Sequence, residues 1–259
     1  MLDKLRRTVR PLTNIGRAVV DTFYAPALYL LAGRKAEDII GKRSASTGEA
    51  ASSNPLESYF DSHLTGAGLW KWRHYFDAYH AHFSRFRGRR PRILEIGVYS
   101  GGSSEMWREY FGEDCEYFGV DIDPACLRFT KNGVTIKTAN QSDRAFWRRF
   151  REEVGEVDIV IDDGGHRPRQ QRPTFEEILR CIKPGGVYLC EDIHGLKNPF
   201  AAYMRGIANE LNANRFNGVQ AWVRSVTFYP YIAVLEILDR PRAPLVSEMR
   251  GDDWLEPGW

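Results

Sequence analysis

The chain has 259 residues, 43% hydrophobic and 13% aromatic, which is enough to bury one substantial core. Its 36 basic and 34 acidic residues leave a net charge of +2, so no strong field favours nucleic acid or an acidic membrane as a partner. No secretory signal is evident, and no apolar run reaches the roughly 20 residues that span a bilayer. Four cysteines without metal-like spacing are expected to be reduced, buried thiols of a cytoplasmic protein: Cys115, Cys126, Cys181 and Cys190.

The first third of the chain is expected to form two helical segments joined by a linker. Residues 1–43 are basic and then apolar, and predict an N-terminal helical arm. The arm packs on its own body or on a partner subunit, which favours a homo-oligomer; peripheral membrane contact is the alternative. Residues 44–54 are small and polar, as in a flexible linker.

Residues 55–90 are dense in aromatic side chains and histidines. Trp72, Phe76, Tyr79 and Phe83 recur at a spacing of three to four, which predicts a helix with one aromatic, packed face. Aromatic faces near a pocket mouth would also suit sugar stacking, which the pattern alone leaves open.

Strands and helices alternate over residues 91–238, as in an α/β domain built on a mostly parallel sheet. Residues 239–259 are rich in proline and charge, and are expected to be a surface tail. The predicted strands cover residues 92–96, 116–120, 134–138, 157–161, 187–190, 223–228 and 232–237, the last two as an antiparallel pair. The predicted helices run through Met106, Trp107 and Tyr110; through Phe146 and Phe150; from residue 170 to residue 182; and from Phe200 to Leu211.

A glycine turn after the first strand predicts a ligand site for a nucleoside. Glu95 precedes the turn, and the free N–H groups at the start of the next helix can approach a ligand. Asp121, at the end of the second strand, can accept hydrogen bonds from both ribose hydroxyls. Glu95 can hold the ammonium of an amino-acid tail. Ile122 can pack on the base, and Asn140 or Gln141 can bind its exocyclic amine. The candidate cofactor-binding residues are Glu95, Gly97, Tyr99, Gly101, Ser103, Asp121, Ile122, Asn140, Gln141 and Asp162.

Two further strands end in acidic residues. The strand at 157–161 is followed by Asp162, Asp163, two glycines and His166, and the strand at 187–190 by Glu191 and Asp192. The carboxyl ends of parallel strands meet at one edge of an open sheet, where ligands bind. Several carboxylates are therefore expected to lie together there.

These motifs resemble class I S-adenosylmethionine-dependent methyltransferases over residues 91–238, with Pro184-Gly185-Gly186 before the fifth strand adding to the match. Asp162 to His166, followed by Glu191-Asp192, resembles the metal-dependent sugar O-methyltransferases of antibiotic biosynthesis. Residues 70–76 also resemble an N-terminal segment of that group. Two departures are Asn140, where many members have Asp, and His194 after the acidic pair. The resemblance implies a Rossmann-like fold with seven strands and helices on both faces, S-adenosylmethionine as cofactor and a sugar-containing molecule or oligosaccharide as acceptor.

In that chemistry a divalent cation lowers the pKa of the acceptor hydroxyl and orients it. Mg²⁺ or another divalent cation would be held by Asp163, Glu191 and Asp192, because Mg²⁺ prefers oxygen ligands. His166 is the candidate general base, and Asp163 and His166 are the candidate catalytic residues. Asp162 is expected to face the cofactor side or to orient the turn.

Other functions remain open at this stage. A catechol-type or other small-molecule O-methyltransferase would use a divalent cation in the same way, to acidify and orient its acceptor hydroxyl. A metal-dependent oxidoreductase of the non-haem iron type would want two histidines and a carboxylate, and only His166 lies beside the acids. A non-catalytic nucleoside-binding scaffold is the third class.

Overall fold

The computed structural model describes residues 25–41, 54–194, 198–251 and 253, with side chains from residue 31 onward. The chain divides into two compact units, residues 1–51 and 52–259. Helix α2 (Ala25–Ile40) is the described element of the first unit and lies within the predicted arm. The rest of that arm and the predicted linker up to residue 53 lie outside the described residues.

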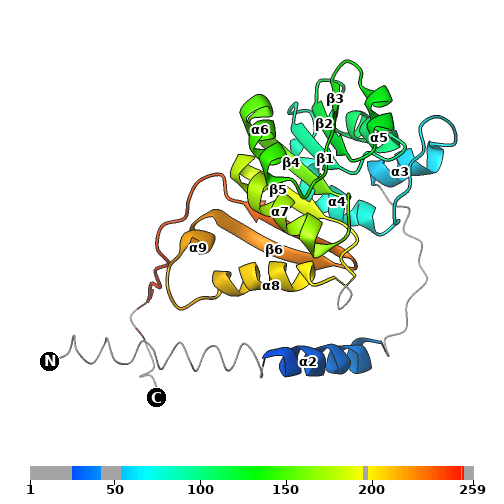
Figure 1. Ribbon diagram of the computed structural model, residues 1–259. Coiled ribbons are helices and arrows are strands. Elements are labelled where there is room, and N and C mark those ends of the chain that lie inside the picture. Colours follow the sequence, from blue (N-terminus) through cyan, green and yellow to red (C-terminus); the bar gives the residue numbers. More distant parts are fainter. Residues whose placement is uncertain (1–24, 42–53, 195–197, 252, 254–259) are drawn as a thin grey trace. The chain divides into compact units, whose positions relative to one another are not determined.

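The second unit is built on one seven-stranded sheet with the order β3-β2-β1-β4-β5-β7-β6. Strands β1 to β5 are parallel, and β7 is antiparallel to both β5 and β6 (Figure 1). The strands are β1 (Arg92–Ile96), β2 (Glu116–Asp121), β3 (Val134–Thr138), β4 (Val157–Asp162), β5 (Ile182–Cys190), β6 (Val223–Tyr229) and β7 (Ile232–Ile237). The helices are α3 (Pro55–Ser62), α4 (Tyr75–Phe83), α5 (Gly102–Phe111), α6 (Arg144–Val154), α7 (Pro168–Ile178), α8 (Phe200–Leu211) and α9 (Gly218–Trp222). Short 3-10 turns lie at Ser84–Phe86, Pro124–Phe129 and Leu179–Cys181.

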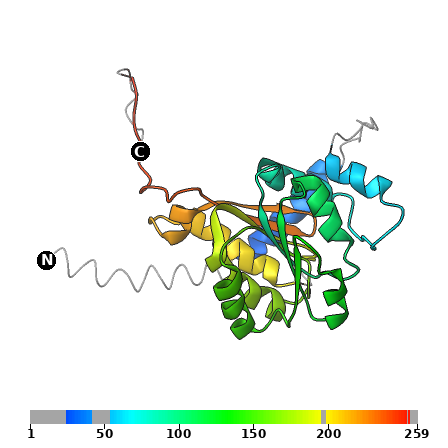
Figure 2. The ribbon, with the colours of Figure 1, turned by 90° about the horizontal axis from the view of Figure 1, so that it is seen from above.

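Helices cover both faces of the sheet, as Figure 2 shows. Alternate residues of a strand point to opposite faces. In β4, Ile159 and Ile161 pack with residues of α3, α4 and α5, whereas Val160 packs with residues of α6, α7 and α8. The predicted Rossmann-like fold, a mostly parallel seven-stranded sheet between helices, is confirmed.

The region between α7 and β5 departs from the prediction of one helix over residues 170–182. α7 begins at Pro168 and ends at Ile178, and Ile182 already pairs with Val157 of β4. The next pair is Ile159 with Val187, so residues 183–186 form a bulge within β5. Glycines at positions 185 and 186 permit this bulge, since Gly185 has a φ of +79°.

Two predictions around the aromatic segment were wrong at its boundaries. Trp72 lies in the loop before α4, because the helix begins only at Tyr75, and its side chain is exposed. Phe76, Tyr79 and Phe83 are fully buried, as the aromatic face predicts. Asn54 is not part of a linker: it is buried and caps α3 by accepting a hydrogen bond from the N–H of Leu56.

All four cysteines are free and buried, as predicted. Across the described ranges, no helix combines the length and apolarity that crossing a bilayer would require. Residues 240–250 of the tail form no helix or strand and are exposed, and Arg242 anchors its start by hydrogen bonds to the carbonyls of Gln220 and Ala221.

Candidate active site

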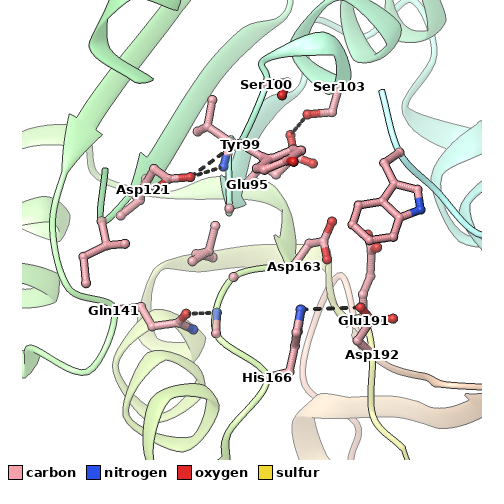
Figure 3. A pocket seen from close by; sticks show the side chains of 18 of the residues that line it. Glu95, Tyr99, Ser100, Ser103, Asp121, Gln141, Asp163, His166, Glu191 and Asp192 are labelled. Carbon is pink, nitrogen blue, oxygen red and sulfur yellow. Dashed lines mark hydrogen bonds and ion pairs between the residues drawn. The ribbon is translucent and has the colours of Figure 1, made fainter. Parts of the chain in front are cut away.

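A cavity of about 390 Å³ opens at the carboxyl ends of β1, β2, β4 and β5. The segment 68–72, which precedes α4, forms part of its wall. Figure 3 shows its polar side chains in two groups, with Asp121 and Gln141 on one side and Asp163, His166, Glu191 and Asp192 on the other. We call these the cofactor half and the acidic half.

In the cofactor half, the turn after β1 is fixed by Asp121. Its carboxylate accepts hydrogen bonds from the N–H groups of Val98 at 2.8 Å, Tyr99 at 3.0 Å and Asp123 at 2.9 Å. Burial alone would raise the pKa of Asp121, but these backbone donors outweigh it and lower the pKa. The carboxylate therefore stays charged at the cavity wall.

The turn itself depends on Gly97, which has a φ of +92°. A Cβ at this position would collide with the carbonyl oxygen of Asp163. Close packing of the two backbones at Gly97 therefore brings the end of β4, and with it the acidic half, against the turn.

The predicted base-contacting residues separate into two kinds. Ile122 and Asn140 are exposed and line the cavity. Gln141 also lines the cavity but is buried, and its side-chain amide already has hydrogen-bond partners. It donates to Asp162 and Thr174 and accepts from the N–H of Gly165. Its amide is fully used in holding the loop after β4.

Two predicted cofactor residues do not line the cavity. Gly101 is the residue before α5, in a left-handed conformation. Asp162 is buried behind the cavity wall, where Gln141 donates to it at 3.0 Å and Tyr188 at 2.8 Å. Burial raises the pKa of Asp162 to about 6, against the lowering effect of those two donors. Asp162 therefore does not face the cofactor, and its role in orienting the turn stays a prediction.

Glu95 and Ser103 line the cavity and bond to each other. One carboxylate oxygen of Glu95, Oε2, accepts hydrogen bonds from Ser103 and from the buried Tyr117. The other oxygen, Oε1, is buried and has no hydrogen-bond partner among the described residues. Burial raises the pKa of Glu95.

In the acidic half, Asp163, His166 and Asp192 come together. One ligand atom from each of these residues lies within 4.8 Å of the others. His166 Nε2 is 3.4 Å from Asp192 Oδ2, and Tyr75 donates a hydrogen bond of 2.6 Å to the other oxygen of Asp192 (Figure 3 shows the first contact). Asp192 has a φ of +54°, a strained conformation often found at functional sites.

Glu191, predicted as a metal ligand, is not in this group. Both of its carboxylate oxygens accept hydrogen bonds of 3.0 Å from the ammonium of Lys71, and Tyr79 donates to one of them at 2.5 Å. The same ammonium lies 2.5 Å from Asp163 Oδ2. Glu191 is thus held by the ammonium of Lys71, which is not among the predicted site residues.

The electrostatics of this cluster follow from its burial. Burial alone would lower the pKa of Lys71, but the charges of Asp163, Glu191 and Glu95 outweigh it and raise the pKa. Burial, and then the charge of Asp163, raise the pKa of Glu191 well above its ordinary value, against the lowering effect of Lys71. One ammonium therefore faces three carboxylates here, those of Asp163, Glu191 and Glu95.

The donor set fits a small divalent cation. Two carboxylates and an imidazole within reach of one another supply hard oxygen ligands and one nitrogen, and the cavity leaves room for an acceptor or water. His166 takes part in this group and is therefore a possible ligand, whereas its role as a base stays a prediction.

Lys71, Tyr75 and Tyr79 belong to the site although they are not among the residues predicted from the sequence. Tyr79 belongs to the aromatic helix face that predicts packing, Tyr75 is not part of that predicted face, and Lys71 is separated from Asp163 by 92 positions. The signal that was present is Lys71 itself, a single cation between two tryptophans in an aromatic segment.

Known proteins match the part of the chain that carries both halves of the cavity. Residues 94–193, which include both halves of the cavity, match the family described as "Methyltransferase domain". A Streptomyces olivaceus 8-demethyl-8-(2-methoxy-alpha-L-rhamnosyl)-tetracenomycin-C 3'-O-methyltransferase is 37% identical over 133 residues, which cover 49% of this chain and 33% of the relative. The L-olivosyl-oleandolide 3-O-methyltransferase of Streptomyces antibioticus is 32% identical over 184 residues, 68% of this chain and 45% of the relative.

The matches cover between a third and just under half of the length of these curated relatives. Among solved structures, the MycE methyltransferase from the mycinamycin biosynthetic pathway, in complex with Mg and SAH, superimposes with a TM-score of 0.59 at 24% identity. The superposition covers 84% of this chain and 62% of that one, and shows a shared fold. Residues 94–193 of this chain thus match the model of a methyltransferase domain, and the sheet shares the Rossmann-like fold of that solved structure.

Proposed function

We propose that this chain transfers a methyl group from S-adenosylmethionine to a sugar hydroxyl of a glycoside, an oligosaccharide or a glycosylated natural product. The observation that carries the proposal is the meeting of Asp163, His166 and Asp192 beside a nucleoside-type turn held by Asp121. The names of the matched relatives, which methylate sugars of tetracenomycin and oleandolide compounds, support the choice of acceptor.

The difficulty of this reaction lies in the acceptor, because a sugar hydroxyl is a poor nucleophile while it keeps its proton. A bound divalent cation supplies acidification and orientation of that hydroxyl. Asp163 and Asp192 would hold it, with Glu191 as the further predicted ligand once Lys71 releases it. His166 Nε2 accepts the proton as general base, and Asp192, itself fixed by Tyr75, faces the imidazole and orients it.

The cofactor half has the parts that S-adenosylmethionine requires. Asp121 is charged and stands at the end of β2, where ribose hydroxyls can reach it. Ile122 is 68% exposed and is available to pack on the adenine. Gln141 is buried, whereas Asn140 is exposed in the cavity, so Asn140 is the better candidate for the exocyclic amine.

A cluster of aromatic rings beside the acidic half supports a sugar acceptor. Trp72 lines the cavity, and its ring centroid lies 5.8 Å from that of Tyr231 and 6.1 Å from that of His74. His194 packs on Tyr231 at 4.4 Å. Exposed aromatic faces bind the apolar face of a pyranose ring, whereas the neighbouring carboxylates bind its hydroxyls. His194, which follows the acidic pair, is part of this aromatic cluster and is a further candidate contact for the sugar.

Calorimetry with S-adenosylhomocysteine, with and without Mg²⁺, followed by methyl-transfer assays, tests the proposal. We expect binding of the nucleoside, and transfer to rhamnosyl or olivosyl glycosides only when a divalent cation is present. Transfer to catechols in preference to glycosides would replace the acceptor class, and a protein that binds neither S-adenosylmethionine nor its product would refute the proposal.

We further propose a homo-oligomer in the cytoplasm that does not act on nucleic acid. The support is the balanced charge of +2 and the apolar content of the arm, in which Leu31, Ile39 and Ile40 are each more than half exposed. Light scattering on the full chain measures the oligomeric state, and a monomer at micromolar concentration would contradict this part of the proposal.

A further inference from the structure

The ammonium of Lys71 lies where it would compete with a metal ion for the carboxylate of Asp163. Its side chain is only 3% exposed, and its ammonium lies 2.5 Å from Asp163 Oδ2 and 3.0 Å from both oxygens of Glu191. A divalent cation bound to the same Asp163 carboxylate would be repelled by an ammonium at hydrogen-bond distance, because their charges have the same sign. Binding of a cation there therefore requires Lys71 to move.

A second acceptor for the ammonium lies next to its present place. Glu95 Oε1 is 3.8 Å from Lys71 Nζ, is fully buried, and has no hydrogen-bond partner within the described part of the chain. Ser103 and Tyr117 hold the other oxygen of Glu95 and so fix its carboxylate. The ammonium has to move by at least roughly 1 Å to reach hydrogen-bond distance of this oxygen, and the flexible lysine stem permits the larger movement that takes it away from Asp163.

We propose that Lys71 is an internal counter-ion with two positions. It neutralises Asp163 and Glu191 while no metal is bound, and it moves to Glu95 Oε1 when a divalent cation takes the carboxylate of Asp163. Lys71 is a positioning residue in this scheme, since it acts through the carboxylates. The inference rests on the proposed metal-dependent function, and it adds a regulator of metal affinity to the site.

The scheme predicts opposite effects of two substitutions on metal affinity. Lys71→Met removes the competing cation and leaves Asp163 and Glu191 unpaired, so Mn²⁺ should bind roughly tenfold more tightly, within the usual range for coupled sites. Glu95→Gln removes the charge that receives the displaced ammonium, so Mn²⁺ should bind several-fold more weakly. Lys131→Met is the matched control, because Lys131 pairs with Glu105 on the surface, outside the cavity lining.

The experiment measures Mn²⁺ dissociation constants of the full chain by electron paramagnetic resonance, together with thermal unfolding and binding of S-adenosylhomocysteine. The double variant, Lys71→Met with Glu95→Gln, completes a thermodynamic cycle. We expect the effect of Glu95→Gln to disappear in the Lys71→Met background, which a merely structural role of Glu95 would not produce.

Metal affinity that is unchanged or weaker in a folded Lys71→Met protein would overturn the inference, as would a Glu95→Gln effect that persists in the double variant. If both Lys71 variants fail to fold, Glu95→Gln alone decides, since unaltered Mn²⁺ binding in that variant overturns the inference. A wild-type protein that binds S-adenosylhomocysteine and no Mn²⁺ would overturn the metal dependence itself. Normal metal-dependent methyl transfer with no effect of Lys71→Met would overturn only the role of Lys71.

Discussion

His166 stands at the mouth of the acidic half, where its Nε2 faces Asp192. We expect His166→Ala to lower the rate of methyl transfer by roughly 10²- to 10⁴-fold, the usual contribution of a general base. Binding of S-adenosylhomocysteine should stay unchanged, because His166 belongs to the acidic half. Single-turnover kinetics and calorimetry measure the two effects. His80→Ala is the control, since His80 lies on α4 and bonds to Tyr110, and full activity of the His166 variant would remove the base assignment.

Asp158 lies near the start of β4 and Asp163 directly follows its end, which allows a matched test of the metal site. Asp158 bonds to Lys183 and to the N–H of Arg92, away from the cavity. We expect Asp163→Asn to weaken Mn²⁺ binding at least about tenfold and to abolish metal-dependent transfer, because a ligand charge is lost. Asp158→Asn should change neither. Equal metal affinity of the two variants would argue against Asp163 as a ligand.

Glu236 joins β7 to the aromatic segment and makes part of the stability depend on pH. A hydrogen bond from His82, and then one from Arg85 at 2.6 Å, lower the pKa of Glu236 to about 2 from an ordinary value of 4.5. Because the pKa is lower in the folded protein, this contribution is complete above about pH 4.5 and is lost as the pH falls toward 2.

Urea unfolding of the wild type and of Glu236→Gln between pH 6 and pH 2.5 measures this contribution. We expect the wild type to be the more stable protein at pH 6 and the difference to shrink as the solution becomes acidic. A difference that is constant across this range would show that Glu236 stabilises the fold by packing alone.

Between elements, the close approach of the turn after β1 to the end of β4 depends on Gly97. Gly97→Ala combines a left-handed φ with a collision against the Asp163 carbonyl. Gly88→Ala is the matched control, because Gly88 has a φ of +68° and open space where a Cβ would stand, so it should cost only about 1 kcal/mol of unfolding free energy.

We expect Gly97→Ala to cost at least about 2 kcal/mol more than this control, since the backbone of the loop must shift. It should also weaken both S-adenosylhomocysteine and Mn²⁺ binding, because the turn and Asp163 move together. Chemical unfolding and calorimetry check both effects. Equal stabilities of the Gly97 and Gly88 variants would mean that the turn after β1 and the loop after β4 can move apart without loss of unfolding free energy.

At the level of the entire chain, the unit formed by residues 52–259 contains all seven strands and the cavity. We expect a protein of residues 52–259 to fold, to keep its melting temperature within a few degrees and to bind S-adenosylhomocysteine as the full chain does. If the arm makes the oligomer, this shorter protein should be a smaller species in light scattering. An unfolded product would show that the first 51 residues complete the core.

Much of the fold could be predicted because its determinants are local. β4 is an apolar run interrupted only by Asp158 and ending in Asp162, and it was predicted to within one residue of its observed end. The boundary of α7 was missed because residues 183–186 look like a helix stop, whereas pairing with β4 draws Ile182 into the sheet. Trp72 was misplaced for a similar reason, since a spacing of three to four continues past the true start of a helix.

Local pattern alone was sufficient for the order of the seven strands and of helices α4 to α8, though not for α3 and α9. It was also sufficient for the edge at which Asp121, Asp163 and Asp192 lie, because parallel strands end on the same side of a sheet. Tertiary structure decided which charges meet there. Lys71 reaches Asp163 and Glu191 across 92 and 120 positions, and no periodicity carries such a contact. The physical reason is burial: once Glu191 and Glu95 leave water, a cation must neutralise part of their charge, and only the folded chain determines which one lies within reach.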